Sequence, residues 1–150
     1  MLASTLRRLD EHGRDHDRVY AIEQPANGRE FKIMTAEDAW HETQRAQSAH
    51  FYEVLTGPCN LYLDIEWYES AQPSKVCEEH RVHHIVQHVI ACVKAVYGVQ
   101  QTTVTRATAS GMCKGKYKCS WHVHVACDKV CWANSLAVGQ FVRKHCATLA

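Results

Sequence analysis

Residues 60–70 read NLYLDIEWYES, and the alternation within this stretch decides how the chain folds. Successive side chains of a β-strand point to opposite faces, so the apolar residues at every second position of 61–67 share one face. Tyr62, Asp64 and Glu66 share the other face. Because a buried carboxylate without a partner is costly, this second face needs water or a partner for its two charges. The stretch predicts a strand with one core face and one acidic face.

A second strand, KCSWHVHVAC at 118–127, divides its residues in the same way. Ser120, His122 and His124 share one face, and the residues between them are apolar or cysteine. If this strand neighbours the first, two carboxylates, a hydroxyl and two imidazoles line one cleft. Carboxylates held this close repel one another unless a cation lies between them, and hard oxygen ligands suit Mg²⁺ or Mn²⁺. The alternative is an ordinary solvated face of an antiparallel sheet.

The rest of the chain alternates between helical and strand patterns. Helices are predicted at 1–12, 35–47 and 76–97, with a last one capped by Asn134 or Ser135. Further strands are predicted at 19–23, 30–34, 50–55 and 102–108, and a glycine- and lysine-bearing loop at 109–117. The pattern is typical of an α+β fold with mainly antiparallel sheets and helices packed on one side.

Local signals support several of these boundaries. Asn27-Gly28 predicts a hairpin turn between the first two strands, and Thr35 with Asp38 resembles a capping box. Gly98 is a natural stop for the long helix. The short TGPC link at 56–59 favours antiparallel pairing of the strands on either side of it.

Composition excludes few classes of protein. The chain has 150 residues, 46% of them apolar, and a formal net charge of +1, so a nucleic-acid partner is neither required nor excluded. No apolar run is long enough to cross a bilayer, which predicts a protein that does not enter the membrane. The eight cysteines are scattered and no secretory signal precedes them, which favours free thiols over a disulfide framework.

Two motifs carry a family resemblance. LYLDIEW (61–67) resembles the Asp-x-Glu motif of the archaeo-eukaryotic primase superfamily, and KCSWHVHV (118–125) resembles its Ser-x-His motif. Four further segments are similar to the N-terminal half of the eukaryotic primase-polymerases within that superfamily. They are VYAIE, GREFKIMTAEDAW, HFYEV and VGQFVRKHC. The resemblance covers about residues 18–146. It implies an N-terminal αβ module at about 1–55 and the beginning of an RRM-like module at about 56–150.

The resemblance also implies a function: a DNA-directed primase and DNA polymerase that joins nucleoside triphosphates on a template or primer strand. Asp64 and Glu66 would bind Mn²⁺ or Mg²⁺ for two-metal phosphoryl transfer. The triphosphate would contact Lys118, Ser120 and His122, and Arg29 would contact the nucleotide. Such enzymes act in repriming, damage-tolerant replication and translesion synthesis, in the nucleus or the mitochondrion.

One departure from the superfamily pattern limits this expectation. The superfamily has a third metal-binding aspartate well downstream, whereas the only acidic residue after His122 in this sequence is Asp128. The C-terminal zinc-binding module and the regions that would meet single-stranded DNA-binding proteins have no counterpart here either. The sequence is therefore expected to be the N-terminal part of a catalytic core, with no zinc in it. The full-length protein is expected to be a nucleotidyltransferase, and this chain alone is expected to be inactive or impaired.

Two other classes of function remain open. The His-Val-His triplet at 122–124 resembles that of HUH-type replication nickases, although no tyrosine follows residue 124 to act as nucleophile. Because the third aspartate is missing, the chain could also be a catalytically silent module that binds nucleic acid or nucleotide.

Three other groups of residues could bind ligands. His80, His84 and His88 share a helical face, and a solvated stripe is favoured there over a metal site. Buried free thiols are favoured over zinc for the four cysteines Cys113, Cys119, Cys127 and Cys131. Lys114 and Lys116 are either solvated or attract phosphates of the triphosphate or the template.

Overall fold

The computed structural model describes residues 2–14, 16–23, 28–45 and 50–146, and confirms the α+β class. These residues form four helices and two antiparallel sheets, of three and four strands. The chain divides into two compact units, Met1–Leu55 and Thr56–Ala150. We call them the N-terminal and C-terminal units and describe each by itself.

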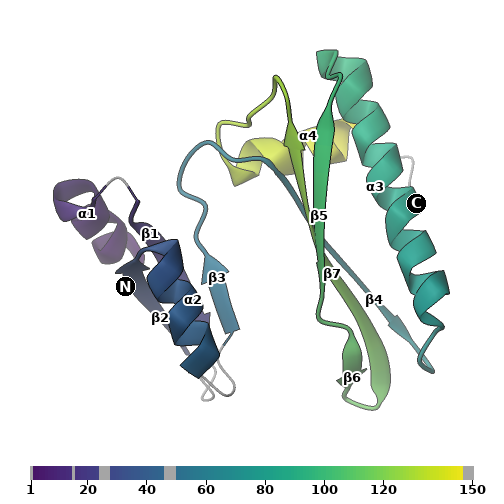
Figure 1. Cartoon of the computed structure of the whole chain (residues 1–150), viewed down its shortest axis with the longest axis horizontal. Helices are drawn as coiled ribbons and strands as arrows, with labels where there is room; N and C mark the ends of the chain where they lie inside the picture. The colour runs from purple at the N-terminus through teal and green to yellow at the C-terminus, as the bar shows by residue number, and fades with distance from the viewer. Residues whose placement is uncertain (1, 15, 24–27, 46–49, 147–150) are drawn as a thin grey trace. The chain divides into compact units, whose positions relative to one another are not determined.

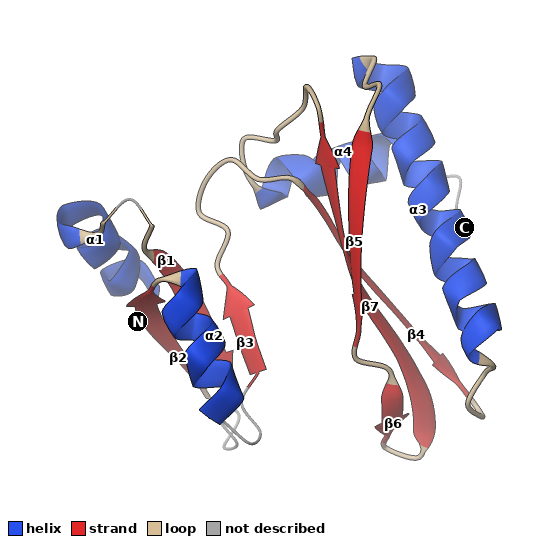
Figure 2. Cartoon of the chain, viewed as in Figure 1, coloured by secondary structure: helices blue, strands red, loops and turns tan. Residues whose placement is uncertain are grey.

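The N-terminal unit is a small sheet with two helices (Figures 1 and 2). Its elements are α1 (Leu2–His12), β1 (Arg18–Glu23), β2 (Arg29–Met34), α2 (Ala36–Arg45) and β3 (His50–Glu53). The strand order is β2-β1-β3, and both pairings are antiparallel. Ile22, Met34 and Ala39 form the centre of its core, with Tyr20 and Phe51 packed against them.

The start of α2 has the predicted cap. The Thr35 hydroxyl accepts a hydrogen bond from the Asp38 amide at 3.1 Å and donates one to the Asp38 carboxylate at 2.8 Å. The predicted turn at Asn27-Gly28 and the predicted end of the helix at Gln47 involve residues 24–27 and 46–49, which lie outside the described residues.

The predicted pairing of the strands around the TGPC link is wrong. β3 pairs with β1, whereas the next strand, β4 (Leu61–Glu69), pairs within the second sheet. Just before β4, Cys59 and Trp132 exchange two backbone hydrogen bonds of 2.9 Å, which fix this part of the chain in the C-terminal unit. Pro58 in the link also lacks an amide hydrogen to donate to a ladder. A short connection therefore favours but does not enforce pairing.

The C-terminal unit is a four-stranded antiparallel sheet with two helices. After β4 come α3 (Lys75–Tyr97), β5 (Thr102–Thr108), β6 (Gly111–Cys113), β7 (Lys116–Cys127) and α4 (Ser135–His145). The strand order is β4-β7-β5, and β6 pairs with the first part of β7. Valines of α3 and of β7 are fully buried together with Leu61 of β4, so the apolar face of the sheet and the long helix share one core.

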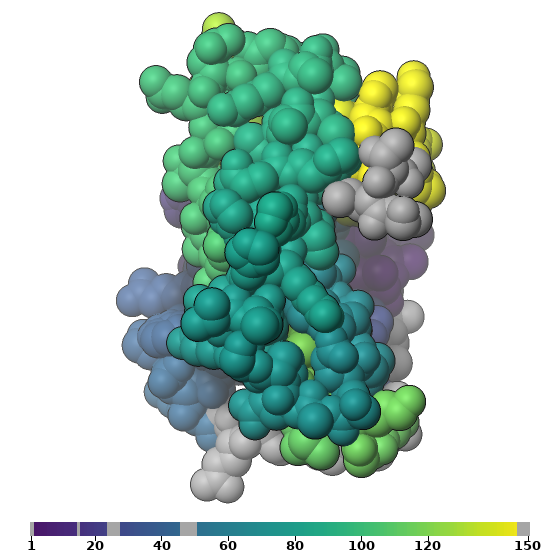
Figure 3. All heavy atoms as spheres, turned by 90° about the vertical axis from the view of Figure 1, so that its right-hand side faces the viewer, coloured from purple at the N-terminus to yellow at the C-terminus, as the bar shows by residue number. Residues whose placement is uncertain are grey.

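In this unit the predicted signals Gly98 and Asn134 lie at helix ends, whereas the cap Ser74 was not predicted from the sequence. Ser74 caps α3 at its first turn and Gly98, with φ of 66°, ends it; Asn134 caps α4. The rings of Tyr97, Trp132 and Phe141 pack together, and the Cys92 thiol donates to the carbonyl of His145, which joins α3 to α4. Figure 3 shows the outer surface of α3 in teal with α4 in yellow beside it. No helix among the described residues is both long enough and apolar enough to span a bilayer.

The prediction of a loop at 109–117 is wrong, because this segment forms a hairpin. Gly111–Cys113 pairs with Lys116–Lys118, and the turn consists of Lys114 and Gly115. Their φ angles are 49° and 80°, and two positive φ values suit the tight turns that match strand twist. Lysine rarely adopts positive φ, so the sequence lacks the usual Asn-Gly or Asp-Gly signal for this turn.

An acid-sensitive contact holds the turn between α1 and β1. Asp17, 8% exposed, accepts hydrogen bonds from the Arg14 amide at 3.0 Å and from the Arg14 guanidinium at 3.2 Å. The hydrogen bond from the Arg14 amide, with that from its side chain, lowers the pKa of Asp17 below the ordinary value of 3.8. Because the pKa of Asp17 is lower in the folded protein than in the unfolded chain, its charge stabilises the fold at pH values above the ordinary pKa. This stabilisation is lost as the pH falls through the lowered pKa of the folded protein.

We therefore expect Asp17→Asn to be less stable than the wild type at pH 7 and equally stable in strong acid. Chemical denaturation at pH 7 and at pH 2 measures the difference. A deficit that persists unchanged at pH 2 would show that Asp17 contributes through packing and not through its charge.

Candidate functional site

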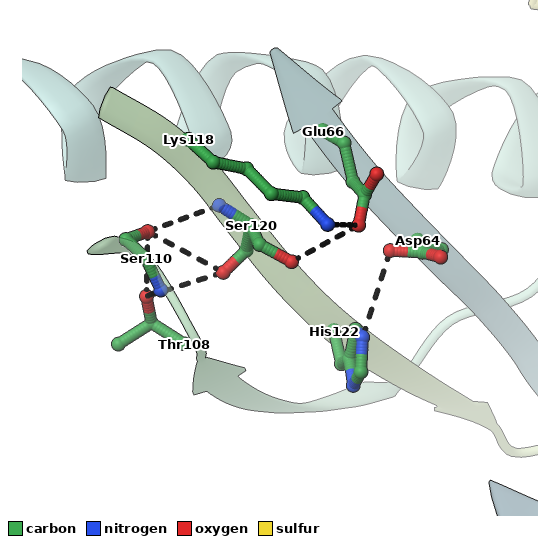
Figure 4. A network of polar contacts seen from close by, with 7 residues as sticks. All are labelled: Asp64, Glu66, Thr108, Ser110, Lys118, Ser120 and His122. Atoms are coloured by element: carbon green, nitrogen blue, oxygen red, sulfur yellow. Dashed lines mark hydrogen bonds and ion pairs between the residues drawn. The ribbon is translucent and has the colours of Figure 1, made fainter. Parts of the chain in front are cut away.

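The pairing of β4 with β7 brings the acidic and the hydroxyl–imidazole residues onto one face. In the antiparallel register Asp64 lies directly opposite His122 and Glu66 directly opposite Ser120. Lys118 lies opposite Tyr68, on the same face and diagonal to Glu66. Figure 4 shows the side chains of Asp64, Glu66, Lys118, Ser120 and His122 on these two strands, with the ribbon of a helix behind them. Five residues from two strands therefore share a surface of one sheet.

Three contacts link the two strands across this surface. The Lys118 ammonium lies 2.5 Å from Glu66 Oε1, and the Ser120 hydroxyl donates to the same oxygen at 3.2 Å. His122 Nε2 lies 3.6 Å from Asp64 Oδ1. The hydrogen bond from Lys118 lowers the pKa of Glu66, and the same bond raises the pKa of Lys118. Each carboxylate thus faces a cationic or basic side chain of β7.

The exposure of these side chains differs in a way that matters for binding. The side chains of Asp64, Glu66 and His122 are 53%, 38% and 39% exposed. Ser120 is only 3% exposed, since neighbouring groups enclose it. The carboxylates can therefore receive a ligand from solvent, while Ser120 provides a fixed hydroxyl beneath them.

A network on the other side of β7 holds the backbone of Ser120 in place. The Ser120 amide donates to the Ser110 hydroxyl at 3.0 Å, and that hydroxyl donates to the carboxylate of Glu78. Glu78, 5% exposed in the first turns of α3, also accepts from the indole N–H of Trp121 at 2.6 Å. Thr108 completes the bridge by donating its hydroxyl to the Ser120 carbonyl at 3.2 Å. At the break between β5 and β6, the Ser110 hydroxyl thus accepts the hydrogen bond of the Ser120 amide in place of a backbone carbonyl of a neighbouring strand.

Glu78 and Ser110 were not predicted from the sequence. The available signal was the position of Glu78 in the buried stripe of α3, four residues before Val82 and eight before Val86. A carboxylate within an apolar stripe needs donors, and it indicates a structural or functional role. No comparable signal marks Ser110, because its partners lie 10 and 32 residues away in the chain.

Tyr62 and His124 extend the site along the same face. The ring of Tyr62 lies 5.8 Å from the rings of both His122 and His124, centroid to centroid. His124 is exposed and lies directly opposite Tyr62 in the register. Packing against Tyr62 limits the positions that the His122 ring can adopt, so Tyr62 helps to orient His122 toward Asp64.

Arg29 and Asp128 have other surroundings. Arg29 begins β2 in the N-terminal unit, and its guanidinium pairs with Glu23 at 3.1 Å. Asp128 follows the last residue of β7, six residues beyond His122, which is about 20 Å along an extended strand. Asp128 is therefore too far along β7 to join Asp64 and Glu66.

The remaining candidate ligands are dispersed. His80 and His84 are exposed with ring centroids 4.5 Å apart, and His88 contacts the Cys92 sulfur at 3.6 Å. In the described ranges, no three or more His, Cys, Asp or Glu side chains are arranged to hold a metal ion together.

The cysteines are free thiols, although the prediction that four of them are buried is wrong in part. Cys119 is buried, but Cys113 and Cys127 are half-buried and Cys131 is exposed. Cys113 and Cys127 are the last residues of β6 and β7, and Cys131 lies in a loop, so the alternation within the strands is a poor guide to their burial.

No family model and no curated protein matches the chain.

Proposed function

We propose that this chain carries the cation- and triphosphate-binding strands of a DNA-directed primase-polymerase. The observation that supports the proposal most is the register in which Asp64 faces His122 and Glu66 faces Ser120. This register brings two carboxylates, a hydroxyl and an imidazole together on one sheet face, which supports the proposal because the resemblance to the primase superfamily calls for these groups. The α+β fold with antiparallel sheets is consistent with the same proposal.

The two carboxylates suit a divalent cation. Asp64 and Glu66 present hard oxygen donors on one face, and the ammonium of Lys118 already lies in contact with Glu66 Oε1. Mn²⁺ or Mg²⁺ bound there would draw together the attacking hydroxyl and the α-phosphate. Together Asp64 and Glu66 supply two of the three acidic ligands of the superfamily. We therefore propose nucleotide binding by these two strands, with catalysis only where a third acidic ligand also reaches the site.

The donors of β7 suit a triphosphate. Lys118 offers a mobile ammonium, Ser120 a fixed hydroxyl and His122 an imidazole N–H, at every second position of one strand. Positions two apart in a strand are separated by about 7 Å, so Lys118 would reach a phosphate chain near His122 only through its long side chain, and the buried Ser120 hydroxyl would contact a phosphate once it no longer donates to Glu66.

Nucleotide incorporation on a primed single-stranded template by the gene product that contains this chain tests the proposal. We expect incorporation that requires Mn²⁺ or Mg²⁺ and is lost in Asp64→Asn. Nucleotide binding without incorporation would contradict the proposal and favour a silent binding module. A covalent protein–DNA adduct on single strands would contradict it and favour a nickase.

The β6–β7 hairpin suits the phosphate backbone of the template. Lys114 and Lys116 are exposed, and within the part of the chain that the structure describes neither forms an ion pair. Residues 109–118 contain three lysines and no acidic residue, so this hairpin carries a local positive charge on a nearly neutral chain.

We expect Lys114→Ala with Lys116→Ala to weaken binding of single-stranded DNA and to lower its salt dependence. Each lost phosphate contact should reduce the slope of log K against log salt by about 0.7. Fluorescence anisotropy over a salt series measures it, with Lys129→Ala as the control for loss of an exposed lysine. Slopes that are equal in the hairpin variant and the control would exclude a template contact here.

A further inference from the structure

Two free thiols lie together where the end of α4 packs on α3. Cys92 lies within α3 and is half-buried, whereas Cys146 caps the C-terminus of α4 and is buried. The Cys92 thiol donates a hydrogen bond of 3.2 Å to the carbonyl of His145, the residue before Cys146. A carbonyl oxygen and the next Cα of a trans peptide are about 3 Å apart, so Cys92 Sγ lies within about 6 Å of the Cys146 Cα.

The two side chains also contact each other. The Cys146 thiol shares a hydrogen bond with the Cys92 thiol, and burial together with this hydrogen bond raises the pKa of Cys146 to about 11. At neutral pH Cys146 is therefore a protonated thiol directly beside Cys92. Two thiols in contact need only small side-chain rotations to form an S–S bond of about 2.05 Å.

An imidazole lies beside the more accessible thiol. His88, one helical turn before Cys92, has its Nε2 3.6 Å from Cys92 Sγ. The thiol hydrogen can rotate from the carbonyl of His145 to this nitrogen, which can accept it. The thiolate is the nucleophilic form of cysteine, and an ordinary thiol is only about a few per cent ionised at pH 7. A base in contact with Cys92 therefore makes Cys92 the reactive thiol of the pair.

We propose that Cys92 and Cys146 form a reversible disulfide in the presence of a peroxide. His88 takes the proton of Cys92, and the thiolate attacks one oxygen of hydrogen peroxide, whose O–O bond breaks. The departing hydroxide takes the proton from His88, which leaves a sulfenic acid on Cys92 and one water molecule. The sulfur of Cys146 then attacks the Cys92 sulfur, the S–O bond breaks, and the hydroxide leaves with the Cys146 proton as a second water molecule. The two thiols lose two electrons, and the peroxide gains them.

The disulfide links the end of α4 covalently to α3. In the reduced protein the packed rings of Phe141 and Tyr97 and the hydrogen bond from Cys92 hold α4 on α3, and Figure 3 shows the two helices side by side. The loop that the disulfide closes contains β5, β6, β7 and α4. Closing a loop of this kind restricts the unfolded chain more than the folded one, so oxidation should stabilise the C-terminal unit.

The test is treatment of the whole chain with hydrogen peroxide at pH 7, followed by peptide mass spectrometry and thermal unfolding. We expect the peptides that contain Cys92 and Cys146 to be joined with the loss of two hydrogen atoms. The Tm should rise by about 5 °C or more. Dithiothreitol should restore both thiols and the original Tm.

Three variants test the assigned roles. In Cys146→Ala the sulfenic acid on Cys92 should accumulate and be trapped by dimedone, since its partner thiol is gone. His88→Ala should lose the Cys92 thiol about tenfold more slowly, and added imidazole should restore the rate, which a purely structural role would not allow. Cys77→Ala is the matched control, because Cys77 is exposed on the same helix and in the described ranges its sulfur forms no hydrogen bond. It should change neither the rate nor the product.

The competing pair in this unit is Cys59 with Cys131, whose Sγ lies 3.4 Å from the Cys59 carbonyl. A disulfide between these two cysteines, or oxidation of Cys92 that leaves Cys146 a thiol, would overturn the inference. Cys92→Ala gives a second test that leaves the buried residue in place. In this variant Cys146 should keep its thiol and peroxide should not raise the Tm, and a rise equal to that of the wild type would also overturn the inference.

Discussion

Asp64→Asn and Glu66→Gln should each weaken the Mn²⁺-dependent binding of a nucleoside triphosphate by about 100-fold or more, the upper range for groups that support a metal. Both substitutions keep the size of the side chain and remove its charge. Both side chains are more than a third exposed, so the stability of the fold should change by less than about 0.5 kcal/mol. A large loss of binding with little loss of stability is the signature of a ligand-binding carboxylate.

Titration calorimetry with a deoxynucleoside triphosphate at fixed Mn²⁺, together with thermal unfolding, measures both quantities. Glu69→Gln is a matched control, since Glu69 lies on the same strand but points to the other face, where it pairs with Arg81. Equal nucleotide affinity in the wild type and both site variants would show that Asp64 and Glu66 do not take part in nucleotide binding.

Glu78→Ala should destabilise the C-terminal unit by about 2–5 kcal/mol, the largest stability effect that we expect from one polar substitution. The variant leaves the buried indole N–H of Trp121 and the half-buried Ser110 hydroxyl without this acceptor. Each unsatisfied buried donor costs about 1–3 kcal/mol. For a domain of this size the loss should lower the Tm by more than about 10 °C.

Thermal and urea denaturation measure this loss. The matched control is Glu79→Ala, the next residue of α3, whose carboxylate is exposed and lies 3.8 Å from Lys75. Exposed ion pairs of this kind contribute about 0–1 kcal/mol. Both hydrogen bonds go to Oε1, so in the more conservative Glu78→Gln the amide oxygen can accept both without the charge, and a smaller loss than in Glu78→Ala is expected. Equal stability of Glu78→Ala and Glu79→Ala would contradict a structural role for the buried carboxylate.

Period-two patterning explains why the two central strands of the site could be predicted. In β4 and β7 the apolar residues fall on one face and the polar residues on the other, and such patterning needs no knowledge of distant contacts. The ends of α3 and α4 were predictable for a similar reason, because Ser74, Gly98 and Asn134 act on backbone groups a few residues away.

Features that depend on distant partners were not predictable in this way. The choice of β1 as the partner of β3 depends on the core of the N-terminal unit, and the Cys59–Trp132 bridge spans 73 residues. The network of Glu78, Ser110 and Ser120 joins three segments of the chain. The Lys114-Gly115 turn shows a different limit, because the surrounding ladder imposes positive φ on a residue that does not favour it.

The central claim is that Asp64, Glu66, Ser120 and His122 surround one bound metal–triphosphate complex. Paramagnetic broadening by Mn²⁺ tests it most directly, since the amide signals nearest the ion in an NMR spectrum of the chain disappear first. With a nucleoside triphosphate present, we predict that broadening begins at residues 64–66 and 120–122 and is absent from these residues in Asp64→Asn. Broadening centred instead on the exposed histidines of α3, with the signals of β4 and β7 unaffected, would contradict the account.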